Sequence, residues 1–241
     1  MKVVPWFVLT AFSAMLWLAS CTDSSPVNMT PWNPALAQTT ERLLADTHAV
    51  PAPRKAELNA LAQWTAETLD RQGHADLVFI CTHNSRRSHL AQVWAQVAAG
   101  LSYLEGIRTF SGGTEATACN PRTVAAMERA GFEVSQTDTL HGASNPTYLV
   151  ETGMASMSCF SKKYAHEVNP SEGFAAVMTC STADRGCPLV YGADERFATP
   201  YVDPKVSDGT AEEAATYDAR LAQIGTEMLY LMGRVAERVT R

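Results

Sequence analysis

The chain has no excess of positive charge. Its 241 residues include 19 Lys and Arg against 25 Asp and Glu, which gives a formal net charge of −6. No stripe of basic residues interrupts this composition, and that argues against a nucleic-acid partner. Internal repeats and low-complexity segments are lacking as well. The length suits one good core with an extension, or two small domains.

The sequence also lacks an apolar run that comfortably spans a membrane. The uncharged, mostly apolar stretch 3–18 is short for that purpose, and with Lys2 before it and small residues after it the stretch fits an export signal. Residues 18–21, Leu-Ala-Ser-Cys, resemble the lipobox of bacterial lipoproteins. This resemblance implies a signal peptide over residues 1–20 and a lipid on Cys21 that anchors the exported protein in the bacterial cell envelope, facing the periplasm. An ordinary signal peptide or an anchor helix with a chance cysteine is the alternative.

The next segments predict a linker and then helices. Residues 21–38 are rich in Ser, Thr, Pro and Asn, as expected of a tether from the membrane. Residues 39–74 show helical spacing in two pieces, interrupted by Pro51 and Pro53 and ending at a C-cap glycine, Gly73. We expect a helical extension that packs on a main domain of residues 75–241.

From Asp76 onward, strand-like and helix-like segments alternate. Buried strands are predicted at 77–80, 107–111 and 174–179, a hairpin within 135–173, and a last helix over about 211–239. This order favours an α/β fold, a three-layer sandwich with a central parallel sheet. Ligands of such sheets bind at the carboxyl ends of the strands, so Cys81 and Cys180 are expected to face one crevice.

Residues 81–88, Cys-Thr-His-Asn-Ser-Arg-Arg-Ser, carry the chemistry. A strand, a tight loop and a helix N-terminus form an anion-binding cradle of backbone N–H groups. Cys81 at its base is expected to be a thiolate nucleophile, and Arg87 offers a planar fork for two oxygens of a tetrahedral oxyanion. The alternatives are a structural cysteine, or a metal site of Cys81, His83 and His89, which the two neighbouring arginines disfavour.

The octapeptide resembles the phosphate loop of low-molecular-weight protein tyrosine phosphatases and of thioredoxin-coupled arsenate reductases, which share one fold. Residues 111–115 and 120–127 also look like counterparts in that superfamily. Cys180 and Cys187, which have six residues between them and are followed by Pro188, are similar to the redox segment of the reductases. Asp203-Pro204 matches the Asp-Pro that carries the general acid in both the phosphatases and the reductases. Two departures stand out: His83 replaces a usual glycine and Arg86 a usual cysteine.

The resemblance implies a role for each matching residue. Cys81 would be the nucleophile, Ser88 would donate to its thiolate, and Asp203, with a raised pKa, would be the general acid. Cys180 and Cys187 would complete a thiol relay. The oxyanion would be bound by the loop; its residues are Thr82, His83, Asn84, Ser85, Arg86 and Arg87.

Three functions follow from these residues. The first is an arsenate reductase with a thioredoxin-like reductant as partner, supported by the cysteine pair. The second is a phosphatase acting on phosphotyrosine or other phosphomonoesters through a phosphocysteine at Cys81, and the third a lipoprotein that only binds phosphate or arsenate. No cofactor or metal is expected, and Gln92 and Asn145 stand where some reductases place carboxylates around a potassium ion. A structural disulfide between Cys180 and Cys187 is the alternative to the relay.

Overall fold

The computed structural model describes residues 33–137, 144–186 and 189–239. The signal-peptide, linker and lipidation predictions for residues 1–32, with Cys21, lie outside these residues, and so does Cys187. None of the described helices is long and apolar enough to cross a membrane. The elements in chain order are α1 (Pro34–Ala45), a 3-10 helix η1 (Asp46–Ala49), α2 (Ala52–Gln72), β1 (Ala75–Cys81), α3 (Arg87–Leu101), β2 (Ile107–Gly113), α4 (Pro121–Arg129), β3 (Glu133–Thr137), β4 (Thr147–Glu151), β5 (Ser156–Cys159), β6 (Phe174–Met178), α5 (Ser181–Gly186), β7 (Ala193–Ala198), a 3-10 helix η2 (Pro204–Ser207) and α6 (Glu213–Val239).

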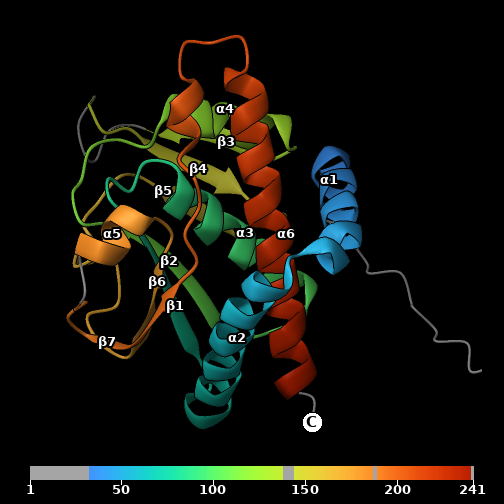
Figure 1. The fold of residues 1–241 in the computed structure, drawn as a ribbon, viewed down its shortest axis with the longest axis vertical. Helices are drawn as coiled ribbons and strands as arrows, with labels where there is room; N and C mark the ends of the chain where they lie inside the picture. Colours follow the sequence, from blue (N-terminus) through green and yellow to red (C-terminus); the bar gives the residue numbers. More distant parts are fainter. Residues whose placement is uncertain (1–32, 138–143, 187–188, 240–241) are drawn as a thin grey trace, which may run out of the picture.

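The centre of the molecule is a parallel four-stranded sheet in the order β2-β1-β6-β7 (Figure 1). Every residue of β1 is buried, because both faces of this strand are covered. In the register, Ile80 lies opposite Met178 and Cys81 opposite Gly113. The predicted α/β fold with a central parallel sheet is therefore confirmed, and Cys81 and Cys180 leave neighbouring strands at the same edge.

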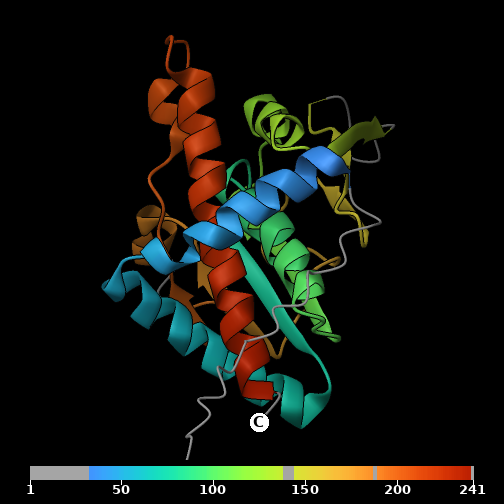
Figure 2. The same ribbon diagram turned by 90° about the vertical axis from the view of Figure 1, so that its right-hand side faces the viewer.

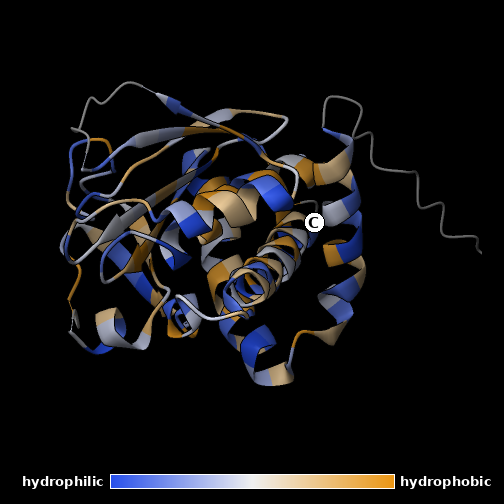
Figure 3. Ribbon diagram, turned by 90° about the horizontal axis from the view of Figure 1, so that it is seen from above, coloured by the Kyte–Doolittle hydropathy of each residue, from blue (hydrophilic) through white to orange (hydrophobic). Residues whose placement is uncertain are grey.

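The two faces of the sheet are covered unequally. Leu77 and Phe79 belong to a large core shared with α1, α2, α3 and α6. Val78 and Ile80 point into a smaller core closed by α5 and the residues around Val190. Figure 3 shows hydrophobic residues on the sides of the helices that face one another. Three layers result, with the thin one on the side of α5.

The N-terminal helices form part of the large core. The first begins at Pro34, where Asn33 accepts a hydrogen bond from the N–H of Ala35, so the helix starts inside the segment expected as a linker. The second ends at Gly73, whose φ of 74° gives the expected left-handed C-cap. Figure 2 shows α1 lying across α6. Leucines from both helices are buried: Leu36, Leu43, Leu58 and Leu61.

A second sheet, antiparallel and in the order β3-β4-β5, covers one end of the molecule. The hairpin expected within residues 135–173 is present as β4 and β5. Two strands were not predicted, β3 and β7, since both are edge strands rich in polar, partly exposed residues and have no apolar alternation.

Candidate active site

The loop between β1 and α3 has its carbonyl groups turned outward. Thr82 O accepts from Glu115 N at 2.8 Å, His83 O from the Ser161 hydroxyl at 2.8 Å, and Ser85 O from Asn120 N at 2.9 Å. Within the described part of the chain, the amide groups of residues 82–87 have no acceptor of their own. These amides are therefore available to an anion at the N-terminus of α3.

Asn84 fixes the shape of the loop and the direction of the Ser88 hydroxyl group. Its φ is 44°, and its Oδ1 accepts from the N–H of Lys162 at 3.0 Å, which determines which way the amide faces. Its Nδ2 then donates to Ser88 Oγ at 2.9 Å. Ser88 Oγ lies 3.2 Å from Cys81 Sγ, and with its oxygen accepting from Asn84 its proton is free to point to the sulfur. His83, which replaces the usual glycine, has no positive φ.

Arg87 and Asp203 lie together beside the loop. The Nη2 of Arg87 donates to Asp203 Oδ2 at 2.8 Å and its Nη1 to the carbonyl of Tyr201 at 3.0 Å. The guanidinium is buried, and its Nε has no partner among the described residues. Asp203 caps η2 by accepting from Lys205 N.

The side chain of Arg86 is directed at Asp203 as well. Its Nε donates to Oδ1 at 2.7 Å and its Nη2 to Oδ2 at 3.2 Å. Burial alone would raise the pKa of Asp203, but the hydrogen bond from Arg86 and the charges of Arg87 and Arg86 outweigh burial, and the pKa is lowered. The expectation of a raised pKa is thus wrong for this state, because Arg86 stabilises the carboxylate.

Cys180 lies next to the loop. The chain leaving β6 is joined to β1 by the bond from Thr179 N to Ile80 O at 2.7 Å, and Thr82 Oγ1 lies 3.5 Å from Cys180 Sγ. Cys81 and Cys180 are free thiols that are 3% and 1% exposed. Two buried thiols therefore lie at the loop between β1 and α3.

The two histidines of the alternative metal site, His83 and His89, do not lie together with Cys81 as a group of metal ligands. His83 directs Nε2 toward Glu115 at 3.6 Å, whereas His89 is fully buried with Nδ1 3.2 Å from Ser111 Oγ. Burial and the charge of Lys162 lower the pKa of His89 to about 3, so the ring is neutral. No three His, Cys, Asp or Glu side chains in residues 33–137, 144–186 and 189–239 are grouped to hold a metal ion. Gln92 donates to the carbonyl of Thr109.

Sequence reasoning missed two supports of the site. Lys162 is buried, and burial lowers its pKa to about 8, while its backbone holds Asn84. The contact of Arg86 with Asp203 joins residues 117 positions apart. The only sequence signal for this contact is a second arginine beside Arg87.

The chain resembles several known enzymes, although no family profile matches it. Arsenate reductase 2 of Staphylococcus epidermidis is 27% identical over 128 residues, which cover 53% of this chain and 77% of the relative. A low-molecular-weight protein tyrosine phosphatase from T. tengcongensis has a TM-score of 0.45 and 14% identity, covering 66% of this chain and 98% of that one. The thioredoxin-dependent arsenate reductase of Corynebacterium glutamicum has a TM-score of 0.37 and 15% identity, covering 78% and 92%. The sequence matches to arsenate reductases support a relation of this chain to those enzymes, and the chain is an enzyme.

Proposed function

We propose that the chain is an arsenate reductase that works through a relay of Cys81, Cys180 and Cys187. The observation that carries this proposal is the second buried thiol: Thr82, the residue after Cys81, contacts Cys180 Sγ at 3.5 Å through its hydroxyl. Phosphoryl transfer needs one thiolate, whereas reduction needs a second thiol within reach of the first.

The first step is attack by Cys81 on arsenate bound in the cradle. The loop amides and Arg87 bind the oxyanion, and Ser88 stabilises the thiolate. The sulfur forms a bond to arsenic and one oxygen leaves as water. With the monoanion H₂AsO₄⁻, both protons of that water come from the arsenate itself. The product is a Cys81–arsenate thioester with two negative charges.

The second step transfers two electrons. Cys180 as thiolate attacks Cys81 Sγ, the sulfur–arsenic bond breaks, and its electron pair stays on arsenic, which becomes arsenite after uptake of three protons from solvent. Cys81 and Cys180 are left as a disulfide. Cys187 then attacks Cys180, Cys81 is released as thiolate, and a thioredoxin-like dithiol protein reduces the Cys180–Cys187 disulfide.

Phosphomonoester hydrolysis through a phosphocysteine is the second candidate, because Asp203 lies at Arg87 where a general acid is needed. That route requires the protonated acid. Both carboxylate oxygens of Asp203 accept from arginines, which favours the anion. The first step proposed for reduction takes both protons from the arsenate and does not depend on a protonated Asp203, whereas hydrolysis does.

Parallel assays separate the two candidates. The purified protein is given arsenate with a thioredoxin-type reductant, and separately an aryl phosphate. We expect multiple turnovers of arsenate in the parent and about one turnover in Cys187→Ser, since the relay stops at the first disulfide. Steady arsenate turnover by the variant contradicts the relay. Full aryl-phosphatase activity without arsenate reduction in the parent supports the phosphatase instead.

We also propose that the enzyme is exported and anchored by lipid on Cys21, facing the periplasm. The lipobox-like residues 18–21 behind the apolar stretch support this location. Mass spectrometry of the native N-terminus should find a lipidated Cys21 and no residues 1–20. A retained Met1 or an unmodified Cys21 contradicts the anchor.

A further inference from the structure

Arg54, in the first turn of α2, reaches the segment that leads to Asp203. Its Nη2 donates to the carbonyl of Pro200 at 2.7 Å. Its Nε lies 3.4 Å from a carboxylate oxygen of Glu227 on α6, and its guanidinium carbon is 5.3 Å from the centre of the Tyr201 ring. The Arg54 side chain is 15% exposed and that of Glu227 4%. Arg54 is therefore a partly buried bridge from the N-terminal helices to residues 200 and 201.

The segment that follows β7 is bound through its amides and through its carbonyls. Its amides donate to the chain leaving β6: Thr199 N to Met178 O at 3.0 Å, and Tyr201 N to Thr179 O at 3.1 Å. Two successive carbonyls accept from two arginines, Pro200 O from Arg54 and Tyr201 O from Arg87. Arg54 and Arg87 thus hold neighbouring peptide groups just before Asp203.

We propose that Arg54 is a positioning residue for Arg87 and Asp203, so that the N-terminal helical extension supports the active site. This role rests on the proposed oxyanion site. Arginine suits it because the planar fork donates in two directions at once, here to Pro200 and the more exposed Glu57, while its Nε lies 3.4 Å from the carboxylate of Glu227. A lysine has one charged nitrogen and cannot span these acceptors. Without Arg54, the carbonyl of Pro200 loses its donor, and the segment keeps only the bond from Arg87 to Tyr201 O and the two amide bonds to the chain leaving β6.

The test measures binding of inorganic phosphate in a Cys81→Ser background, where no turnover occurs, and kcat/KM for arsenate with Cys81 intact. Arg54→Gln is expected to weaken phosphate binding and lower kcat/KM about tenfold, because small displacements of a binding group are costly. Arg54→Lys keeps a positive charge opposite Glu227 and is expected to fold with an intermediate loss. Added guanidinium ion is expected to restore part of the affinity to Arg54→Gln.

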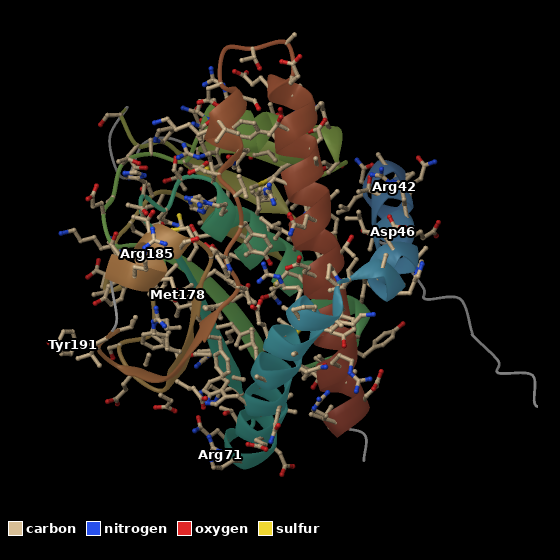
Figure 4. The ribbon with its side chains drawn as sticks, in the orientation of Figure 1. Arg42, Asp46, Arg71, Met178, Arg185 and Tyr191 are labelled. Carbon is tan, nitrogen blue, oxygen red and sulfur yellow. The ribbon has the colours of Figure 1, made fainter. Side chains whose placement is uncertain are left out.

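Two controls separate positioning from stability. Glu227→Gln removes the ion pair but leaves the bond from Arg54 to Pro200, so it should lower thermal stability and keep phosphate affinity. Arg42→Gln alters an exposed arginine of α1, labelled in Figure 4, and should change neither quantity. The proposal is overturned if Arg54→Gln and Arg54→Lys, each in the Cys81→Ser background, bind phosphate as tightly as Cys81→Ser alone and lose only stability. The oxyanion site is not contradicted by that result. A parent that binds no phosphate contradicts the oxyanion site and this proposal together.

Discussion

At the scale of single residues, Arg86 and Arg87 together lower the pKa of Asp203 and keep its carboxylate ionised. One carboxylate accepts three hydrogen bonds from two guanidinium groups. An incoming oxyanion needs the fork of Arg87, and it meets Asp203 already bound there. Because Arg86 also donates to the carboxylate, Asp203 stays paired with a positive charge when its hydrogen bond to Arg87 is broken. The side chain of Arg86 is thus a partner of Asp203, while its backbone amide stays among those of the loop.

Arg86→Gln should raise the pKa of Asp203, because the hydrogen bond and one of the two charges that lower it are removed. NMR of the side-chain carboxyl carbons across acidic pH measures this change. In the phosphatase route proposed as the second candidate, the protonated Asp203 is the general acid, so aryl-phosphatase activity of the variant is expected to rise about tenfold. Arg122→Gln, which alters an arginine paired with Glu213, should leave the titration of Asp203 unchanged. Identical Asp203 titrations in the parent and Arg86→Gln contradict the account.

His89 should make the protein sensitive to acid. Its pKa is about 3 in the folded chain against an ordinary value of 6.5, so between these values only the unfolded chain takes up the proton. The free energy of unfolding therefore falls with falling pH, by about 1.4 kcal/mol per pH unit from this group. His89→Gln should show a flatter dependence between pH 6 and 4 in urea unfolding. His48→Gln, at an exposed ring, should keep the parent slope; equal slopes in all three proteins contradict the prediction.

At the scale of elements, the end of β2 limits the room for the oxyanion loop. A Cβ on Gly113 would lie 2.2 Å from Glu115 O, 2.7 Å from Thr82 O and 2.8 Å from Asn84 N. All three atoms are backbone, so the loop must move to admit a side chain. The close approach of β2 to the loop is therefore part of the binding geometry.

Gly113→Ala should weaken phosphate binding at least about tenfold and reduce stability by about 1–3 kcal/mol through overpacking. Gly233→Ala on α6 is the matched control, because its added Cβ meets no atom within 4 Å. That control should gain up to about 1 kcal/mol from helix propensity and bind phosphate like the parent. Calorimetric titration with phosphate and thermal unfolding provide both quantities; parent-like binding by Gly113→Ala contradicts the account.

Much of this element-scale picture is predictable from local patterns. The apolar run before Cys81 and the helix N-terminus expected after the loop each specify an element, and both are present as β1 and α3. The contacts of Asp203 were beyond such reasoning. They depend on the strand order β2-β1-β6-β7 and on side chains 116 and 117 positions apart, and neither leaves a local pattern in the sequence.

At the scale of the whole molecule, the N-terminal helices and the sheet share one core. Leu43 of α1 packs near Gly225 of α6, where an added Cβ would lie 2.7 Å from its Cδ1. Leu43 is 2% exposed, and the next residue, Leu44, is 44% exposed. An extension that contributes to the core in this way should unfold together with the rest of the chain.

Leu43→Ala should therefore lower the free energy of unfolding of the entire chain by about 2–5 kcal/mol, through lost burial and the cavity left behind. Urea unfolding followed by circular dichroism and by tryptophan fluorescence should give one coincident transition. Leu44→Ala should change the same free energy by less than about 0.5 kcal/mol. A separate early transition in Leu43→Ala, with the main transition unmoved, contradicts a shared core.

The thiol relay is tested most directly by trapping its first disulfide. Reduced Cys187→Ser protein is mixed with an equal amount of arsenate without any other reductant, then alkylated, digested and mapped by mass spectrometry. We expect one arsenite released per protein and a peptide pair joined through Cys81 and Cys180. Cys81→Ser should release none under the same conditions. Alkylated, unlinked Cys81 and Cys180 after exposure to arsenate, in protein that hydrolyses an aryl phosphate through Cys81, would contradict the relay.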